Sequence, residues 1–157
     1  MKQYKRIVLV VMAFVLLFSL SGCIMIPVTK HYNIPADEVK SICFYDLHGE
    51  DGVSYSKLDE RYEPVYTLPQ KEHKAFLKDF SKIKYSRTLI ITIAAVDPGF
   101  SIGDWVIRVD FTNGQYSFYS YAGYGETYDA EGTTVSSNHF GCDEQQFKGL
   151  IQNYCQA

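Results

Sequence analysis

The first 23 residues constrain this chain more than any other stretch. Lys2, Lys5 and Arg6 give a positively charged start, residues 7–20 form an almost unbroken apolar run, and LSGC follows at residues 20–23. A charged start, a short apolar run and small residues at its end are the parts of a secretory signal peptide. The run of about 14 residues is short against the roughly 20 that a membrane-spanning helix needs. We therefore predict a cleaved signal at residues 1–22 rather than a retained transmembrane helix.

The LSGC sequence matches the lipobox of bacterial prelipoproteins, and the chain resembles that export class. The resemblance implies that Cys23 receives a diacylglyceryl group on its sulfur and becomes the acylated N-terminus after cleavage. Stable membrane attachment takes about two acyl chains, which a diacylglyceryl cysteine supplies. We therefore expect a lipid-anchored protein on the extracytoplasmic face of the cell membrane. Ile24 is not the Asp that retains such proteins at the inner membrane of Gram-negative cells, so an outer-membrane location is allowed there.

Composition bounds the remainder of the chain. Three of the 15 Lys and Arg residues and none of the 18 Asp and Glu residues lie in the signal, which leaves residues 23–157 with a net charge of about −6. Binding to nucleic acid requires clustered Lys and Arg, so a nucleic-acid partner is not expected. The length of this part predicts one domain.

The domain is expected to begin after a short linker. Residues 23–38 contain two prolines and no clear period, so we predict the lipidated cysteine followed by a tether, and a single domain at 39–157. Residues 39–46 are β-branched and aromatic, which favours a strand. A second candidate is a hairpin between residues 54 and 66. Residues 122–138, rich in Gly, Tyr, Thr and Ser, are predicted as a loop or as a loop with a short fourth strand around residues 133–136.

Two stretches have apolar residues at helical spacing, and we predict amphipathic helices at 68–83 and 143–154. Thr67 and Pro69 suit the start of the first helix, and Asp143 suits the N-cap of the second. The apolar residues on one side of the first helix are Phe76, Leu77, Phe80 and Ile83. The lysines on its other side, predicted to be a solvated face, are Lys71, Lys74, Lys78 and Lys82, with His73 also expected to be exposed.

Residues 88–96 are the most apolar run outside the signal, and they end at the turn sequence Asp97-Pro98-Gly99. A run of β-branched residues without alternation is typical of a central strand that is covered on both faces. We therefore predict a central strand here.

Residues 105–112 and 115–121 flank Asn113-Gly114, a strong signal for a hairpin with a two-residue loop. Such a loop pairs Phe111 with Tyr116, Val109 with Phe118 and Ile107 with Ser120. We predict that these residues share the core face with Trp105. The opposite face would then carry Tyr119 and Tyr121.

These elements predict an α+β domain with a mostly antiparallel sheet of about four strands packed with two amphipathic helices. The layout resembles small lipoprotein and secreted domains of Gram-positive bacteria whose function is unassigned. The resemblance lies in the order of elements over residues 39–155 and carries over no functional residue.

Three cysteines remain beside Cys23, an odd number that allows at most one intramolecular disulfide. If residues 143–154 are helical, Cys142 and Cys155 lie roughly 20 Å apart, beyond the roughly 7 Å limit for a disulfide. Any bridge would therefore join Cys43 to Cys155 or Cys142, and three thiols are the alternative.

Tyrosine is concentrated in one part of the chain, and this concentration suggests a binding module. Tyr119, Tyr121, Tyr124 and Tyr128 lie in or beside the expected loop, and only Tyr116 is needed for the core in the predicted register. Tyrosine offers large, stiff contact area, which suits recognition of a protein or a glycan at the cell surface. These four residues form the predicted binding surface.

The sequence shows no catalytic motif, and no enzyme activity, cofactor or metal is expected. GxSxG and HExxH are absent, and the cysteines lack the spacing of zinc sites. A metal-dependent hydrolase built from His48, Glu50, Asp51 and His139 is an alternative, as is a structural role in the envelope. The His139 and Cys142 pair would need an orientation that sequence spacing does not establish.

Overall fold

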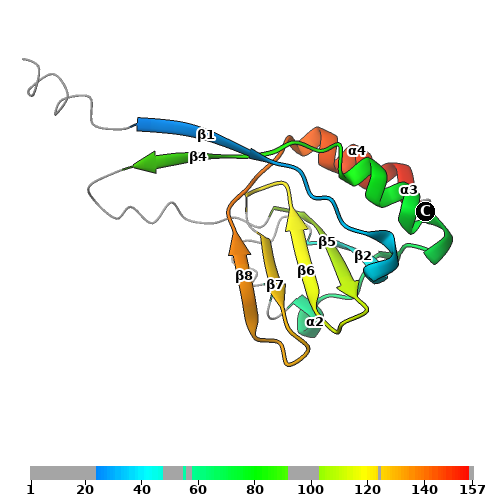
Figure 1. The fold of residues 1–157 in the computed structure, drawn as a ribbon. Helices are drawn as coiled ribbons and strands as arrows, with labels where there is room; N and C mark the ends of the chain where they lie inside the picture. The colour runs from blue at the N-terminus through cyan, green and yellow to red at the C-terminus, as the bar shows by residue number, and fades with distance from the viewer. Residues whose placement is uncertain (1–23, 48–54, 56–57, 92–102, 124, 156–157) are drawn as a thin grey trace, which may run out of the picture. The chain divides into compact units, whose positions relative to one another are not determined.

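Six antiparallel strands form the main sheet of this α+β protein, in the order β3-β2-β5-β6-β7-β8 (Figure 1). The computed structural model describes residues 24–47, 55, 58–91, 103–123 and 125–155. The strands of this sheet are β2 (Val39–Asp46), β3 (Tyr66–Thr67), β5 (Trp105–Phe111), β6 (Tyr116–Ser120), β7 (Gly125–Tyr128) and β8 (Thr134–Asn138). The alternative short strand around residues 133–136 is confirmed as β8. The prediction of about four strands was too low, because β7 also forms within the expected loop and β3 adds an edge.

A second sheet has two strands, β1 (Ile24–Lys30) and β4 (Tyr85–Ile91). The prediction of a central strand at 88–96 is wrong for its described part, since Thr88–Ile91 pairs with β1 and not within the main sheet. Residues 92–96 lie outside the described residues. The predicted tether also contains regular structure, namely β1 and the short 3₁₀ helix η1 (Ala36–Glu38).

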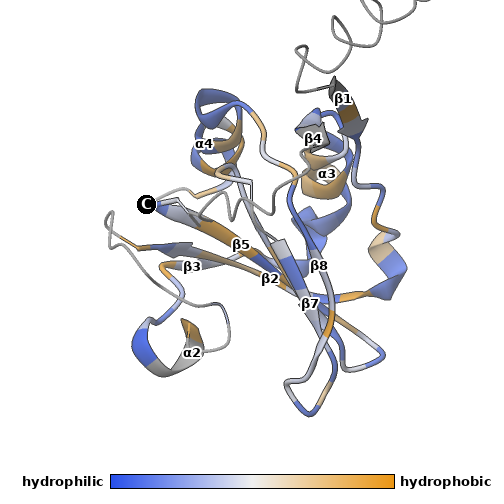
Figure 2. Ribbon diagram, turned by 90° about the vertical axis from the view of Figure 1, so that its left-hand side faces the viewer, coloured by the Kyte–Doolittle hydropathy of each residue, from blue (hydrophilic) through white to orange (hydrophobic). Residues whose placement is uncertain are grey.

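The chain divides into two compact units, one of residues 1–28 and 88–98 and the other of residues 29–87 and 99–157. The larger unit contains the six-stranded sheet and three helices, α2 (Leu58–Arg61), α3 (Gln70–Phe80) and α4 (Glu144–Tyr154). Figure 2 shows α3 and α4 on one face of the sheet and α2 on the other. Leu58–Arg61 is therefore helical where a hairpin was the candidate.

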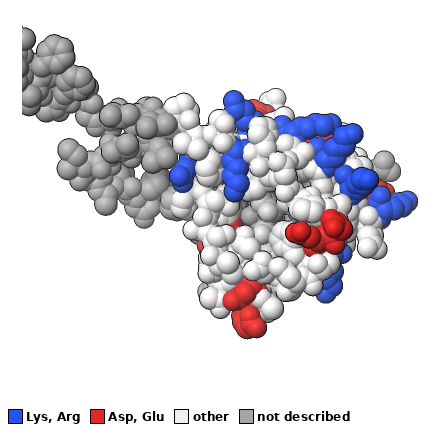
Figure 3. Space-filling model, in the orientation of Figure 1, with Lys and Arg blue, Asp and Glu red and all other residues white. Residues whose placement is uncertain are grey.

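The two predicted helices are confirmed. The three predicted apolar residues within α3, Phe76, Leu77 and Phe80, are buried, as is Ile83 beyond its end. The four predicted lysines are exposed, as expected. Lys and Arg side chains gather over α3 in Figure 3. His73 is an exception, because it is 4% exposed and its Nε2 lies 3.1 Å from the carbonyl oxygen of Leu68. Pro69 occupies the N-cap position, and Thr67 makes no capping contact because it belongs to β3.

In α4, Asp143 accepts a hydrogen bond from the backbone N–H of Gln146 at 2.8 Å, as its predicted N-cap role requires. The helix places Phe147, Leu150 and Ile151 in the core. The three cysteines that the structure describes outside the signal are all reduced thiols. α4 lies between Cys142 and Cys155, which is the arrangement from which we predicted that these two cysteines do not pair with each other.

The β5–β6 hairpin forms at the predicted place with a different register. Its loop has three residues, because the N–H of Phe111 donates to Gln115 and the N–H of Gly114 donates to Phe111. Gly114 has a φ of 87°, which glycine adopts at little cost and which ends the turn with a bulge. Tyr116 therefore pairs with Asp110, and Tyr119 pairs with Ile107.

A shift of one residue moves every side chain of a strand to the opposite face. The prediction for β5 was right, because Ile107 and Val109 lie in the core beneath the helices. The prediction for β6 was wrong, because Tyr119 joins that core while Tyr116 and Phe118 lie on the other face.

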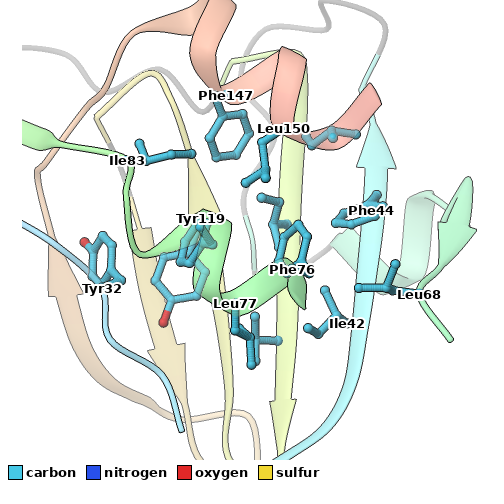
Figure 4. Close-up of a cluster of buried hydrophobic side chains, with 14 of the residues drawn as sticks. Tyr32, Ile42, Phe44, Leu68, Phe76, Leu77, Ile83, Tyr119, Phe147 and Leu150 are labelled. Atoms are coloured by element: carbon cyan, nitrogen blue, oxygen red, sulfur yellow. The ribbon is translucent and has the colours of Figure 1, made fainter. Parts of the chain in front are cut away.

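Both faces of the main sheet are packed. The cluster on the helix side includes side chains from β2, β5, β6, α3 and α4, and Figure 4 shows several of them meeting between the sheet and the helices. The cluster on the opposite face contains Leu58 from α2 together with Tyr55, Val106, Phe118 and Tyr128. Stacking of Tyr55 on Phe118, with ring centroids 4.9 Å apart, belongs to this second cluster.

Candidate functional site

Two of the four tyrosines of the predicted binding surface are buried in the structure. Tyr119 is 8% exposed and Tyr128 is 2% exposed, so the prediction that they belong to an exposed binding surface, Tyr119 on the outer face of the hairpin and Tyr128 in the loop, is wrong. The physical reasons are the register of β6 for Tyr119 and the formation of β7 for Tyr128. Tyr124 lies outside the described residues. Tyr121 is half-buried, and its ring packs near Phe147 of α4.

Tyr128 lies in an aromatic group within the second cluster. Its ring stacks on Tyr116 with centroids 5.2 Å apart and meets Phe118 edge-on at 5.9 Å. Its hydroxyl donates a hydrogen bond to the carboxylate of Glu126. These contacts identify Tyr128 as a packing residue of the sheet.

Tyr121 belongs to a polar network at the end of β6. Its hydroxyl donates to Asp104, and Lys148 Nζ lies 2.5 Å from Asp104 Oδ2 and 2.8 Å from Glu144 Oε1. The hydrogen bonds from Lys148 and Tyr121 lower the pKa of Asp104, and the same carboxylate partners raise the pKa of Lys148. The network joins α4 to the sheet and leaves Tyr121 with a structural partner.

An open groove of about 450 Å³ runs beside residues 30–38, which lead into β2. We call these residues the entry segment and the groove the entry groove. This groove brings together residues from β1, the segment before η1, β5 and β6. The residues that line it are Lys30, His31, Tyr32, Asn33, Ile34, Pro35, Glu38, Phe111 and Tyr119. Tyr119 is thus the one member of the predicted binding surface that the structure places at this groove.

Tyr32 anchors the entry segment from within. Its ring meets Tyr119 and Tyr85 edge-on, each with a centroid distance of 4.8 Å, and its hydroxyl donates to Asn138 Oδ1 at 2.6 Å. Figure 4 shows Tyr32 and Tyr119 close together at one side of the core. Burial raises the pKa of Tyr32, so its hydroxyl stays protonated and acts as a hydrogen-bond donor. These contacts fix the aromatic wall of the groove.

Charged groups of both signs lie at the groove. Lys30 Nζ lies 4.5 Å from the centre of the Tyr32 ring, a cation–π distance. Glu38, at the end of η1, is exposed. His31 Nδ1 lies 3.1 Å from the carbonyl oxygen of Ser81, which attaches the entry segment to the turn after α3. The groove therefore combines an aromatic wall with a cation and a carboxylate.

A second groove of about 380 Å³ is shared between the same entry segment and α3. Its lining is mainly apolar side chains of the entry segment together with Leu77, and Lys74 and Lys78 of α3 also contribute. It lacks the aromatic side chains of the entry groove, so it offers less area for stacking.

The titratable groups near the entry groove are unsuited to nucleophilic attack. Burial raises the pKa of the Cys142 thiol to about 12. Burial also raises the pKa of Tyr85, which lies beside that thiol. A reactive cysteine needs a lowered pKa, because the thiolate is the nucleophile. The Cys142 thiol is therefore protonated at neutral pH and is not an activated nucleophile.

Of the residues proposed for a metal-dependent hydrolase, His48, Glu50 and Asp51 lie outside the described residues. Within the described part of the chain, no group of three or more metal-ligating side chains comes together.

No helix among the described residues is long and apolar enough to cross a membrane.

Sequence reasoning missed most of the entry groove because its residues come from four separate elements. Tyr32 lies in a proline-containing segment without a period, and only its contacts with Tyr85 and Tyr119 identify it as core. The one available signal was that Tyr32 is an aromatic residue in a tether that is otherwise without Phe, Tyr or Trp. Comparison of the chain with known protein families, curated proteins and solved structures found no match.

Proposed function

We propose that this protein is a lipid-anchored extracytoplasmic binding module whose entry groove contacts a protein or a glycan at the cell surface. The observation that carries the proposal is the aromatic wall of Tyr32, Tyr119 and Phe111 beside Lys30 and Glu38. The groove begins at Lys30, the seventh residue after the predicted lipidation site, so a ligand bound there would be held near the membrane.

The chemistry of the groove supports recognition rather than bond breaking. Phe111 is half-buried and offers apolar area to a sugar ring or to an apolar side chain. Tyr32 and Tyr119 are buried behind the groove and fix its shape by their mutual packing. Ordered contact residues lose little conformational entropy on binding. Lys30 and Glu38 add one donor and one acceptor of opposite charge, which would orient a polar ligand.

The anchor is tested by mass spectrometry of the protein extracted from membranes. We expect the mature chain to begin at Cys23 with an acyl modification, because LSGC precedes the cut. The Cys23→Ser variant should retain residues 1–22 and carry no lipid. An unmodified wild-type chain beginning at Met1 would contradict the anchor.

The groove is tested by placing a photo-crosslinking amino acid at Asn33, which lines it, in the full chain expressed in cells. We expect a discrete crosslinked product, and its mass distinguishes a protein from a glycan. The same probe at Asn153, an exposed residue of α4, is the control position and should give no such product.

A matched pair of charge variants sharpens the result. Lys30→Gln with Glu38→Gln should reduce the crosslink at position 33 several-fold, because both side chains line the groove. Lys40→Gln with Glu131→Gln removes the same charges from exposed residues that do not line it and should leave the yield unchanged. Equal yields from the two pairs, or equal crosslinking at 33 and 153, would reject the groove.

A further inference from the structure

The two-stranded sheet of β1 and β4 begins immediately after the predicted lipidation site. Ile24, the first residue of β1, follows Cys23 in the chain. Its partner β4 ends at Ile91, and the two strands run in opposite directions in Figure 1. Antiparallel pairing brings the start of β1 and the end of β4 to the same end of the ribbon, which is the end nearest the anchor.

That end of the ribbon is apolar in sequence. β1 reads Ile-Met-Ile-Pro-Val before it reaches Thr29 and Lys30, and β4 closes with Leu89, Ile90 and Ile91. Consecutive residues of a strand alternate between its two faces. A strand with one solvated face would show a polar residue at every second position, and residues 24–28 and 89–91 contain none.

A two-stranded ribbon of this composition needs a cover. An isolated pair of strands is marginally stable in water at best, and stability comes from packing an apolar face. A lipid-anchored chain brings that cover with it, because acylation at Cys23 places Ile24 at the bilayer surface. The ribbon has two strand edges, and unpaired backbone groups are not tolerated in the hydrocarbon core. Such a ribbon suits the interface of the bilayer and not a span across it.

We propose that the anchor-proximal end of the β1–β4 ribbon, Ile24–Val28 with Leu89–Ile91, inserts into the interfacial region of the bilayer beside the acyl chains. This inference rests on the lipidation in the proposed function. The ribbon adds apolar contact to the lipid anchor, and it restricts the motion of the chain where it leaves the membrane. The described part of the apolar run that begins at Thr88 is thereby a membrane contact.

The test uses the mature lipoprotein purified from membranes and reconstituted into phosphatidylcholine vesicles that contain a lipid with a photoactivatable diazirine in its acyl chain. After illumination, we expect lipid adducts within residues 24–28 and 88–91, located by fragmentation in the mass spectrometer. Peptides from α4 and from β8 should carry none. This measurement is made on the wild type and does not depend on any variant folding.

Ile90→Asp places a charge in the proposed contact, and Val135→Asp is its matched control, because Val135 is a strand residue of β8 that is 55% exposed. We expect Ile90→Asp to lose the adducts and to transfer between vesicles about ten-fold faster, as loss of one buried aliphatic side chain predicts. Val135→Asp should match the wild type in both measurements.

The outcomes separate this inference from the function it rests on. An acylated wild-type chain whose adducts are absent from both strands would overturn the ribbon contact and leave the anchored binding module standing. A wild-type chain without acylation at Cys23 would overturn both. Equal transfer rates for Ile90→Asp and the wild type would also overturn the ribbon contact.

Discussion

The two faces of the main sheet differ in what covers them, although both are packed along the central strand β5. Val106 and Ile107 are neighbours on β5 and point to opposite faces, and each is 0% exposed. Ile107 lies beneath α3 and α4, whereas Val106 packs with Leu58 of α2 and with Tyr55. The comparison teaches that the alternation of side chains along a central strand does not identify a solvent-exposed face when a short helix and loop residues cover the face opposite the long helices.

The cluster on the helix side is the larger of the two among the described residues. It contains 16 buried side chains against seven on the opposite face, so a truncation there removes more contacts. Phe80 illustrates this density, because its ring lies within 6.0 Å, centroid to centroid, of Phe76, Tyr32, Tyr85 and Tyr119. The predictions below rank the two faces and the surface by their effect on stability.

Phe80→Ala is expected to have the largest effect, a loss of about 3–5 kcal/mol in the free energy of unfolding, as for other buried phenylalanines. The side chain is 0% exposed, and the cavity would open among four aromatic rings. Urea denaturation of the wild type and the variant measures the difference. Phe80→Leu, which keeps much of the volume, should cost clearly less. A loss below about 1 kcal/mol would show that the helix side is not the main core.

Tyr128→Ser is expected to cost about 2–4 kcal/mol, somewhat less than Phe80→Ala, because the second cluster is smaller. Tyr128→Phe keeps the stacking on Tyr116 and removes only the hydrogen bond to Glu126, so about 1 kcal/mol is expected. Thermal melting of both variants measures the pair. If Tyr128→Ser melts with the wild type, the second face is a surface and the tyrosine returns as a binding candidate.

Lys148→Met is expected to cost about 1 kcal/mol at neutral pH, since the Lys148 and Asp104 side chains are 27% and 30% exposed and a partly solvated pair contributes little. Because the folded-state pKa of Asp104 is lowered, chiefly by Lys148, its contribution is present above the unfolded pKa and is lost as the pH falls through the folded pKa. The variant and the wild type should therefore converge in stability as the pH falls below the ordinary pKa of an aspartate and through the lowered folded-state pKa of Asp104. A difference that is constant from neutral pH to acid would contradict this pairing.

Val135→Thr is expected to have the smallest effect, within about 0.5 kcal/mol, because surface substitutions away from packing contacts change stability little. Val135 is 55% exposed on β8. Chemical denaturation provides the measurement. A loss of about 1 kcal/mol or more would mean that β8 is covered in the folded protein.

The sequence by itself determined the elements whose information is local. β2 was predicted at its observed bounds, and both long helices followed from the spacing of their apolar residues, since helical and extended periods are properties of a short stretch. The Asp143 N-cap is equally local. The lipobox is also read from adjacent residues, and lipidation of Cys23 stays a prediction until the mass of the mature chain is measured.

Only the tertiary structure decided which residues are surface and which are core. One extra residue in the β5–β6 loop turned Tyr119 inward, and pairing of β6 with β7 buried Tyr128. The apolar run at Thr88 joined β1, and Tyr32 joined the core from the predicted tether. The entry groove likewise exists only when Lys30–Glu38 lies beside Phe111 and Tyr119. Pairing partners and face coverage depend on contacts between residues distant in sequence, and a local pattern carries no information on them.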